Sequence, residues 1–145
     1  MNNETIIDAS GHVVGRLASQ VAKRLLNGEK IVIVNAEKAV IIGSRKSIID
    51  KYMKKLEWRT YYNPEKRGPK IPRRPDTILK RSIRGMLPYK KTRGRKALKR
   101  LKVYIGIPEK YSKFSFITLD VAKKDLEKYD YITLGELSKA IGGMK

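Results

Sequence analysis

Two kinds of hydrophobic periodicity alternate along the first third of the chain. The β-prone run Thr5–Ile7 is followed, from Val14 to Leu26, by apolar residues spaced three and one apart, typical of one face of an α-helix. Asn27 and Gly28 indicate the end of this helix, and the aliphatic run Ile31–Val34 suits a strand buried on both faces. A strand, a helix and a strand within about 30 residues predict a βαβ unit.

The next elements predict a further strand and helix. Ala39–Ile42 has the composition of a strand, and Ser44 can cap a helix that runs to about Glu57. A parallel crossover usually needs a dozen or more residues, but only Asn35–Lys38 separates this strand from the one before it. The strand direction around residues 35–43 therefore stays open between a hairpin and a very short second strand. The expected inner face of the helix consists of Ile48, Ile49, Tyr52, Met53 and Leu56.

The middle of the chain loses this periodicity. Residues 58–76 hold four prolines, which disfavour regular helix and predict an extended arm or long loop. Asp76 is expected to cap a helix from Thr77 to Leu87, which Pro88 ends. Beyond it we expect, in order, a basic loop at Tyr89–Gly94, a helical turn at Arg95–Arg100, a strand at Leu101–Gly106 and a final helix from a capping box at Thr133 and Glu136 through Ile141.

Charge changes the interpretation of this middle segment. The 145 residues carry a net charge of +20, with a pI of about 10.2. Residues 51–102 hold 20 of the 34 Lys and Arg but only three of the 14 acids, a net +17 against +3 for the rest. So large a charge destabilises a compact state unless a polyanion neutralises it. Its concentration in one segment predicts a directed nucleic-acid-binding face.

Lysine and arginine in this segment are the candidate nucleic-acid-binding residues, because cations neutralise phosphates and release counterions. Trp58, Tyr61 and Tyr62 lie among them and could stack unpaired bases, which favours folded RNA over regular duplex. Ile83, Met86 and Leu87 are expected to anchor the face to the core, and Gly85 and Gly94 to allow close backbone approach or positive φ. The candidates are Arg59, Lys66, Arg67, Lys70, Arg73, Arg74, Lys80, Arg81, Arg84, Lys90, Lys91, Arg93, Arg95, Lys96, Lys99 and Arg100.

Catalytic and metal chemistry find little support. The chain has no cysteine and one histidine, so a Cys-based metal site, a disulfide framework and a Cys nucleophile are excluded. The loop at residues 8–15 joins a strand to a helix N-terminus, where a nucleotide-dependent enzyme could hold phosphate, but it lacks both the Walker and the GxGxxG patterns. Asp8, Ser10 and His12 are too close in sequence to form a triad easily. We expect no catalytic residue, metal or cofactor, and a local hydrogen bond for His12.

Membranes and DNA are weaker alternatives as partners. The N-terminus lacks the basic and long apolar regions of a signal peptide, and no aliphatic run is long enough to span a bilayer. The charge lies on Pro-rich and Gly-rich segments with few bulky apolar residues, which disfavours a lipid surface. We expect a soluble, cytoplasmic protein that does not bind membrane, with a DNA-compacting protein as the alternative within nucleic-acid binding.

Five segments carry a family resemblance in the same order. They are DASGHVVGRLAS (Asp8–Ser19), IVNAEKAVIIG (Ile33–Gly43), IRGMLP (Ile83–Pro88), LKVYIG (Leu101–Gly106) and ITLGELSKAIGG (Ile132–Gly143). Together they resemble the large-subunit ribosomal protein L-thirteen family, and the last segment resembles its archaeal and eukaryotic branch. After Gly106 the chain has Ile-Pro-Glu-Lys-Tyr where bacterial members tend to carry a histidine-containing segment, which favours an archaeal source.

The resemblance implies both a fold and a function. The implied fold is a three-layer α/β/α domain with a small, largely parallel four-stranded sheet, which disfavours the hairpin. Residues 1–145 would form a single domain, with 58–76 as the basic Pro-rich arm and 109–145 as a C-terminal extension. The implied function is a non-catalytic constituent of the large subunit that binds 23S-type rRNA and supports assembly. Its partners would be that rRNA and neighbouring ribosomal proteins, with no obligate homo-oligomer.

Overall fold

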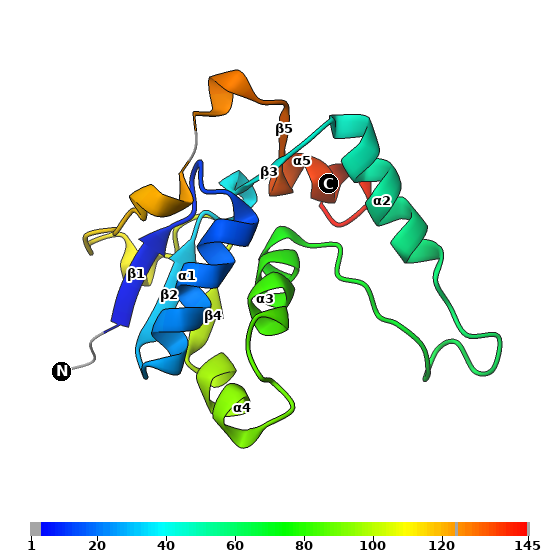
Figure 1. Cartoon of the computed structure of the whole chain (residues 1–145), viewed down its shortest axis with the longest axis horizontal. Helices are drawn as coiled ribbons and strands as arrows, with labels where there is room; N and C mark the ends of the chain where they lie inside the picture. Colours follow the sequence, from blue (N-terminus) through cyan, green and yellow to red (C-terminus); the bar gives the residue numbers. More distant parts are fainter. Residues whose placement is uncertain (1–3, 124, 145) are drawn as a thin grey trace.

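A parallel sheet of three strands lies at the centre of the computed structural model, which describes residues 4–123 and 125–144 (Figure 1). The strands are β1 (Glu4–Asp8), β2 (Lys30–Val34) and β4 (Leu101–Val103), with β2 in the middle. Both pairings are parallel, and Ile33 of β2 lies opposite Ile7 on one side and Val103 on the other. The predicted βαβ unit and the α/β class are confirmed.

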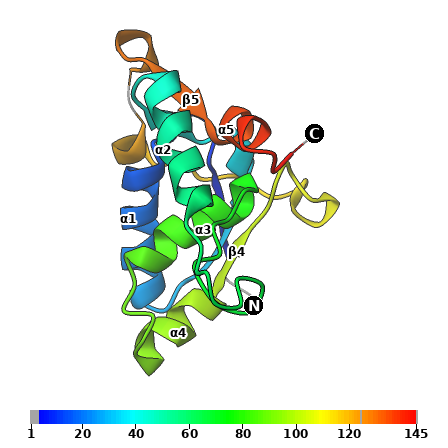
Figure 2. The same cartoon turned by 90° about the vertical axis from the view of Figure 1, so that its right-hand side faces the viewer.

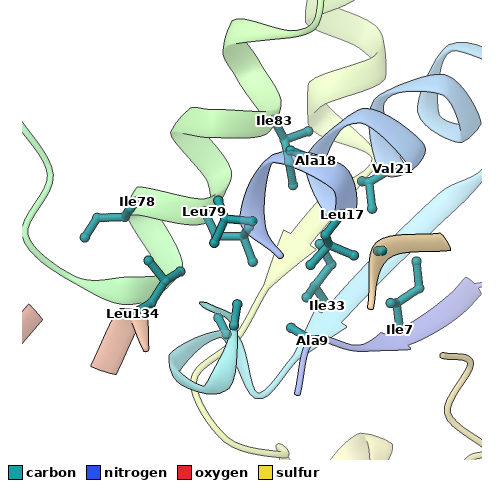
Figure 3. Close-up of a cluster of buried hydrophobic side chains, with 14 of the residues drawn as sticks. Ile7, Ala9, Leu17, Ala18, Val21, Ile33, Ile78, Leu79, Ile83 and Leu134 are labelled. Carbon is teal, nitrogen blue, oxygen red and sulfur yellow. The ribbon is translucent and has the colours of Figure 1, made fainter. Parts of the chain in front are cut away.

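The main core lies between this sheet and two helices. Helix α1 (Val14–Leu26) makes the crossover between β1 and β2, and α3 (Pro75–Gly85) packs against it. Figure 3 shows Leu17 of α1, Ile33 of β2 and Leu79 of α3 in one cluster, and all three are fully buried. Each such side chain contributes about 1.5–3 kcal/mol relative to its exposed state. The basic segment is therefore tied to the core through α3.

The opposite face of the sheet has an irregular cover. Ile6, Val32 and Val34 alternate with the residues of the main core and form a second cluster with Tyr111. Tyr104 and Phe116 also pack there, and the segment contains the 3₁₀ turn η2 (Glu109–Tyr111). The third layer is thus built from loop and a 3₁₀ turn rather than from an α-helix.

The chain turns out of the main sheet at Asn35. This residue has a left-handed backbone with φ of 54°, and the 3₁₀ turn η1 (Ala36–Lys38) follows it. Strand β3 (Val40–Ile42) then pairs antiparallel with β5 (Tyr131–Thr133). The hairpin alternative is wrong, because β3 pairs with a strand about 90 residues later and not with β2. Of the four predicted strands, three form the parallel sheet and β3 lies in this second sheet.

Helix boundaries follow the capping residues closely. Helix α2 (Arg45–Glu57) begins after Ser44, whose hydroxyl accepts from the Ser47 N–H at 3.4 Å. Helix α5 (Leu134–Ala140) begins with the predicted capping box, in which Thr133 and Glu136 each accept the other's backbone N–H at 3.2 Å. Side-chain oxygens satisfy N–H groups that have no partner inside the helix.

Three expectations about the basic segment need correction. Helix α3 starts with Pro75 in its first turn, so Asp76 lies inside the helix and does not cap it. A proline suits this position because its missing N–H would have no helical partner. Helix α4 (Thr92–Lys99) takes in part of the expected basic loop and is longer than the predicted turn. Met53 and Met86 were expected to face inward but are nearly half exposed.

The last third of the chain packs onto the first elements. Ile117 forms a parallel bridge with Ile7, and the Leu119 N–H donates to Nε2 of His12 at 3.0 Å. His12 is fully buried, so it makes a long-range bond in addition to the predicted local one, the 3.1 Å contact of Nδ1 with the Ser10 carbonyl. The turns η3 (Asp120–Ala122) and η4 (Leu126–Lys128) follow.

Candidate nucleic-acid interface

The candidate cations form three groups in space. Six lie on the arm, and α3 carries Lys80, Arg81 and Arg84. The other seven lie between Lys90 and Arg100, in and next to α4. All sixteen are exposed to solvent except Arg100, which is mostly buried. Figure 1 shows the arm as a long loop that leaves the end of α2, extends away from the body and returns to the start of α3.

The returning end of the arm is held against two helices. Nη1 of Arg81 on α3 donates to the Lys70 carbonyl at 2.7 Å, and the Ser138 hydroxyl on α5 donates to the Arg73 carbonyl at 2.6 Å. Ile71 and Pro72 between these bonds are partly buried, whereas residues 61–70 are all exposed. In Figure 2 the arm passes on the same side of the molecule as α2 and α3. The structure therefore brings Lys70 beside the cations of α3.

A tight turn connects α3 to α4. A Cβ placed on Gly94 would overlap the carbonyl of Pro88, so the predicted close approach at this glycine is confirmed. Gly85 has neither a positive φ nor a close neighbour, and that part of the prediction is wrong. The guanidinium of Arg84 lies 4.4 Å from the centre of the Tyr89 ring, a cation–π contact that orients its charge.

Arg100 has a different environment from the other candidates. Its Nη2 donates to the carbonyl of Leu25 at 2.8 Å, in the last turn of α1. Its Nε is buried and has no hydrogen-bond partner among the described residues. The Leu25 carbonyl also accepts from the Gly28 N–H at 3.1 Å, so Arg100 is its second donor, and a cation at a helix C-terminus interacts favourably with the helix dipole. The geometry thus gives Arg100 a role in stabilising α1.

The outer face of α2 adds cations that sequence reasoning missed. Lys46, Lys51, Lys54 and Lys55 lie around a shallow hollow that continues to Trp58, with Asp50 as its one acid. Lys51 and Lys54 lie three residues apart and Lys51 and Lys55 four apart, so these cations follow the period of the helix. That period, applied to charge rather than to hydrophobicity, was the available signal. They widen the basic surface beyond the candidates.

The loop at residues 8–15 is occupied by structural hydrogen bonds. Asp8 Oδ1 accepts from the Ser10 hydroxyl at 2.7 Å and from Nδ2 of Asn35 at 3.0 Å, while His12 contacts the Ser10 carbonyl and not its hydroxyl. Burial acts to raise the pKa of Asp8, but these hydrogen bonds outweigh it and lower the pKa. The Gly11, His12 and Val13 N–H groups donate to backbone carbonyls. The loop therefore offers neither a triad nor these N–H groups for phosphate.

The described residues also bear on metal and membrane binding. Within residues 4–123 and 125–144 there is no cluster of three or more His, Cys, Asp or Glu side chains that could hold a metal ion. In the same ranges no helix is both long enough and apolar enough to cross a membrane. Fold and surface together define a class: a small α/β protein with one strongly cationic face.

Comparison with known proteins specifies the family. A family model described as Ribosomal protein L13 matches residues 2–110. The chain is 54% identical over 140 residues to large ribosomal subunit protein uL13 of Methanocaldococcus jannaschii, covering 95% of this chain and 97% of that protein. It is 47% identical over 140 residues to the protein of the same name from Archaeoglobus fulgidus, covering 95% and 87%. A third relative of that name, from Pyrobaculum islandicum, is 63% identical over 108 residues, or 72% of this chain and 58% of that protein.

The chain therefore belongs to the Ribosomal protein L13 family, and the resemblance in its five segments is confirmed. Proteins of this family are structural components of the cytoplasmic ribosome and not enzymes. The relatives named above are archaeal, in agreement with the source that the segment after Gly106 favours.

Proposed function

We propose that this protein binds large-subunit, 23S-type rRNA through lysine and arginine contacts to phosphate, and so supports assembly of the large subunit. The observation that carries the proposal is the exposure of fifteen of the sixteen candidate cations in a segment of net charge +17. A surface of this kind has little reason to persist without a polyanion, because its charges repel one another.

The two halves of the basic surface suit different contacts. The cations of α3 and α4 stand on short helices whose inner faces are buried, so their positions are defined before RNA binds. Arg59, Lys66 and Arg67 stand on the part of the arm that precedes its hydrogen bond to α3 and are exposed, so they can follow a groove of folded RNA or contact a neighbouring ribosomal protein. The cations of the helices would thus bind phosphates at fixed positions, and those of the arm would adapt to RNA or protein farther from the core.

We further propose that residues 1–145 act as one unit without homo-oligomerisation, with 58–76 as the arm and 109–145 as an integrated extension. Leu119, Ile132 and Leu137 of that last segment are buried in the main core. The packing of the C-terminal segment supports this view because its removal would expose the first elements.

Salt dependence of rRNA binding tests the phosphate contacts. A plot of log affinity against log salt concentration should be steep, and each lost phosphate contact should reduce its slope by about 0.7–0.9. A variant with Lys80, Arg84 and Lys96 changed to Gln should lower the slope by about 2. The matched control changes Lys23, Lys110 and Lys113 to Gln, which removes the same charge from exposed sites elsewhere.

Two results would contradict the proposal. One is a slope near zero for the unaltered protein, and the other is an equal loss of slope in both triple variants. Competition between duplex DNA and folded rRNA fragments separates rRNA binding from general compaction of nucleic acid, since only the former predicts that rRNA wins at equal nucleotide concentration.

A further inference from the structure

A cavity of about 220 Å³ lies between α2, α3 and the returning end of the arm. Its walls include two aromatic side chains from α2 and the residue after it, Tyr52 and Trp58. Ile71 and Pro72 of the arm and Ile78 of α3 complete the apolar part of the lining. We call this cavity the Trp58 slot.

The shape of the slot depends on the clamp between arm and helix. The bond from Arg81 to the Lys70 carbonyl holds Ile71 and Pro72 across α3. A second hollow of about 370 Å³ shares Ile71, Pro72 and Arg81 with the slot. Its cationic lining residues are Lys70, Lys80, Arg81 and Arg84. A track of cations therefore leads along α3 to the slot.

The polar residues of the slot are cationic or neutral. Lys55, Arg81 and Ser82 are its remaining lining residues, and no acid is among the eight. The Lys55 ammonium lies 5.1 Å from the centre of the Tyr52 ring. An apolar lining gives a phosphate no hydrogen bonds, whereas cations beside it can hold the phosphates that flank an inserted group.

Size and exposure agree with a flat ligand. The volume equals that of about seven liquid waters at about 30 Å³ each, which is enough for one or two fused rings and far too small for a duplex. Trp58 is 58% exposed, so much of its ring is free to stack. Stacking on an aromatic face tolerates any base, because every base has a π face.

We infer that the Trp58 slot receives one unpaired base of the bound RNA, stacked against Trp58, with Lys55 and Arg81 on the flanking phosphates. The inference rests on the proposed rRNA binding and adds that this surface selects an unpaired nucleotide. An apolar side chain of a neighbouring protein is the competing occupant, and the lack of an acid in the lining together with the cationic track favours RNA.

Single-stranded RNA with and without one base tests the slot on the full-length protein. The probe is a seven-nucleotide oligouridylate with 2-aminopurine at its centre, and the reference has an abasic site there with the same number of phosphates. At low salt we expect the probe to bind about tenfold more tightly, or about 1.4 kcal/mol. Trp58 is the only tryptophan of the chain, so quenching of its fluorescence by the probe reports stacking in the slot.

Three variants localise the preference. Probe binding is followed by 2-aminopurine fluorescence, and binding of the abasic reference is measured by its competition against the probe. Trp58→Ala should abolish the advantage of the probe over the abasic reference, and Ser82→Phe should do so by filling the slot without changing charge. Tyr61→Ala is the matched control, because Tyr61 is an arm aromatic that is 95% exposed and does not line the slot. It should keep the full tenfold preference.

The outcomes separate this inference from the proposed function. Equal affinity for probe and reference, or a preference that survives in both Trp58→Ala and Ser82→Phe, overturns the slot and leaves a side chain of a neighbouring protein as its occupant. The steep salt dependence on rRNA would persist in either case, because phosphate contacts do not need the slot. A flat salt dependence would instead remove the proposed function itself.

Discussion

Replacement of Arg100 by alanine separates structural cations from RNA-binding ones. Its guanidinium donates to the Leu25 carbonyl at the end of α1, so the change removes a charge-assisted hydrogen bond from the last turn of a core helix. We expect Arg100→Ala to destabilise the fold while leaving the salt slope of rRNA binding unchanged. The matched control is Lys99→Ala, which alters an exposed cation at the adjacent position on α4.

Opposing contributions decide the size of this effect. A hydrogen bond from a charged donor stabilises by about 1.5–3 kcal/mol, and a cation at a helix C-terminus adds about 0.3–1 kcal/mol. The buried Nε without a partner among the described residues costs about 1–3 kcal/mol, and that cost disappears with the side chain. We therefore expect a net loss of about 1 kcal/mol for Arg100→Ala, and less than about 0.5 kcal/mol for Lys99→Ala.

Urea denaturation followed by circular dichroism measures both variants, since α1 and the other helices dominate the signal. The midpoint of Arg100→Ala should fall without a change in the denaturant slope, because the exposed area on unfolding stays the same. Unchanged stability combined with a salt slope reduced by about 1 would refute the reasoning. It would show that Arg100 leaves Leu25 to contact phosphate.

Three further predictions concern the fold. His12 is the only histidine, and burial is the main cause that lowers its pKa below the ordinary 6.5, so the unfolded chain binds the proton more readily than the folded one. The free energy of unfolding should therefore fall as the pH drops below about 6.5. This pH dependence should vanish in His12→Asn, and its persistence in that variant would refute the assignment. Gly94→Ala should cost about 1–3 kcal/mol in urea denaturation, since the new Cβ overlaps the Pro88 carbonyl, while Gly85→Ala, with open space around it, should cost nothing measurable; equal effects would contradict this packing. Thr133→Ala should lower the free energy of unfolding by about 1 kcal/mol, because α5 loses its cap, whereas Thr133→Ser keeps the hydroxyl and should retain most of the stability. Equal losses in both variants would argue against the capping box.

Local sequence patterns predicted the helices and strands better than they predicted which elements pack or pair together. The apolar spacing over Val14–Leu26 gave α1 with its observed bounds, and the capping box at Thr133 gave the start of α5. Both signals are local because a helix satisfies its backbone within a few residues. The start of α3 at Pro75 was missed because Asp76, directly after this proline, has the pattern of a capping acid before Thr77.

The pairing of β3 shows what local patterns leave undecided. Its residues read as a strand, but its partner β5 lies about 90 residues away, and nothing within Val40–Ile42 specifies that distance. The same holds for His12, whose Nε2 accepts a hydrogen bond from the Leu119 N–H 107 residues away in the sequence. Contacts between distant segments form only when the whole core is assembled, so a reading of neighbouring residues does not reveal them.

For the candidate interface, the sequence by itself determined that one segment of the chain carries nearly all the excess charge, because charge is a property of composition. Tertiary structure alone decided which of those cations are available. It turned Arg100 inward to cap α1, placed Lys70 beside α3 through the clamp from Arg81, and joined α2 to the basic face. The physical reason is that availability depends on burial and on hydrogen-bond partners from other elements, and folding brings those partners together from distant parts of the chain.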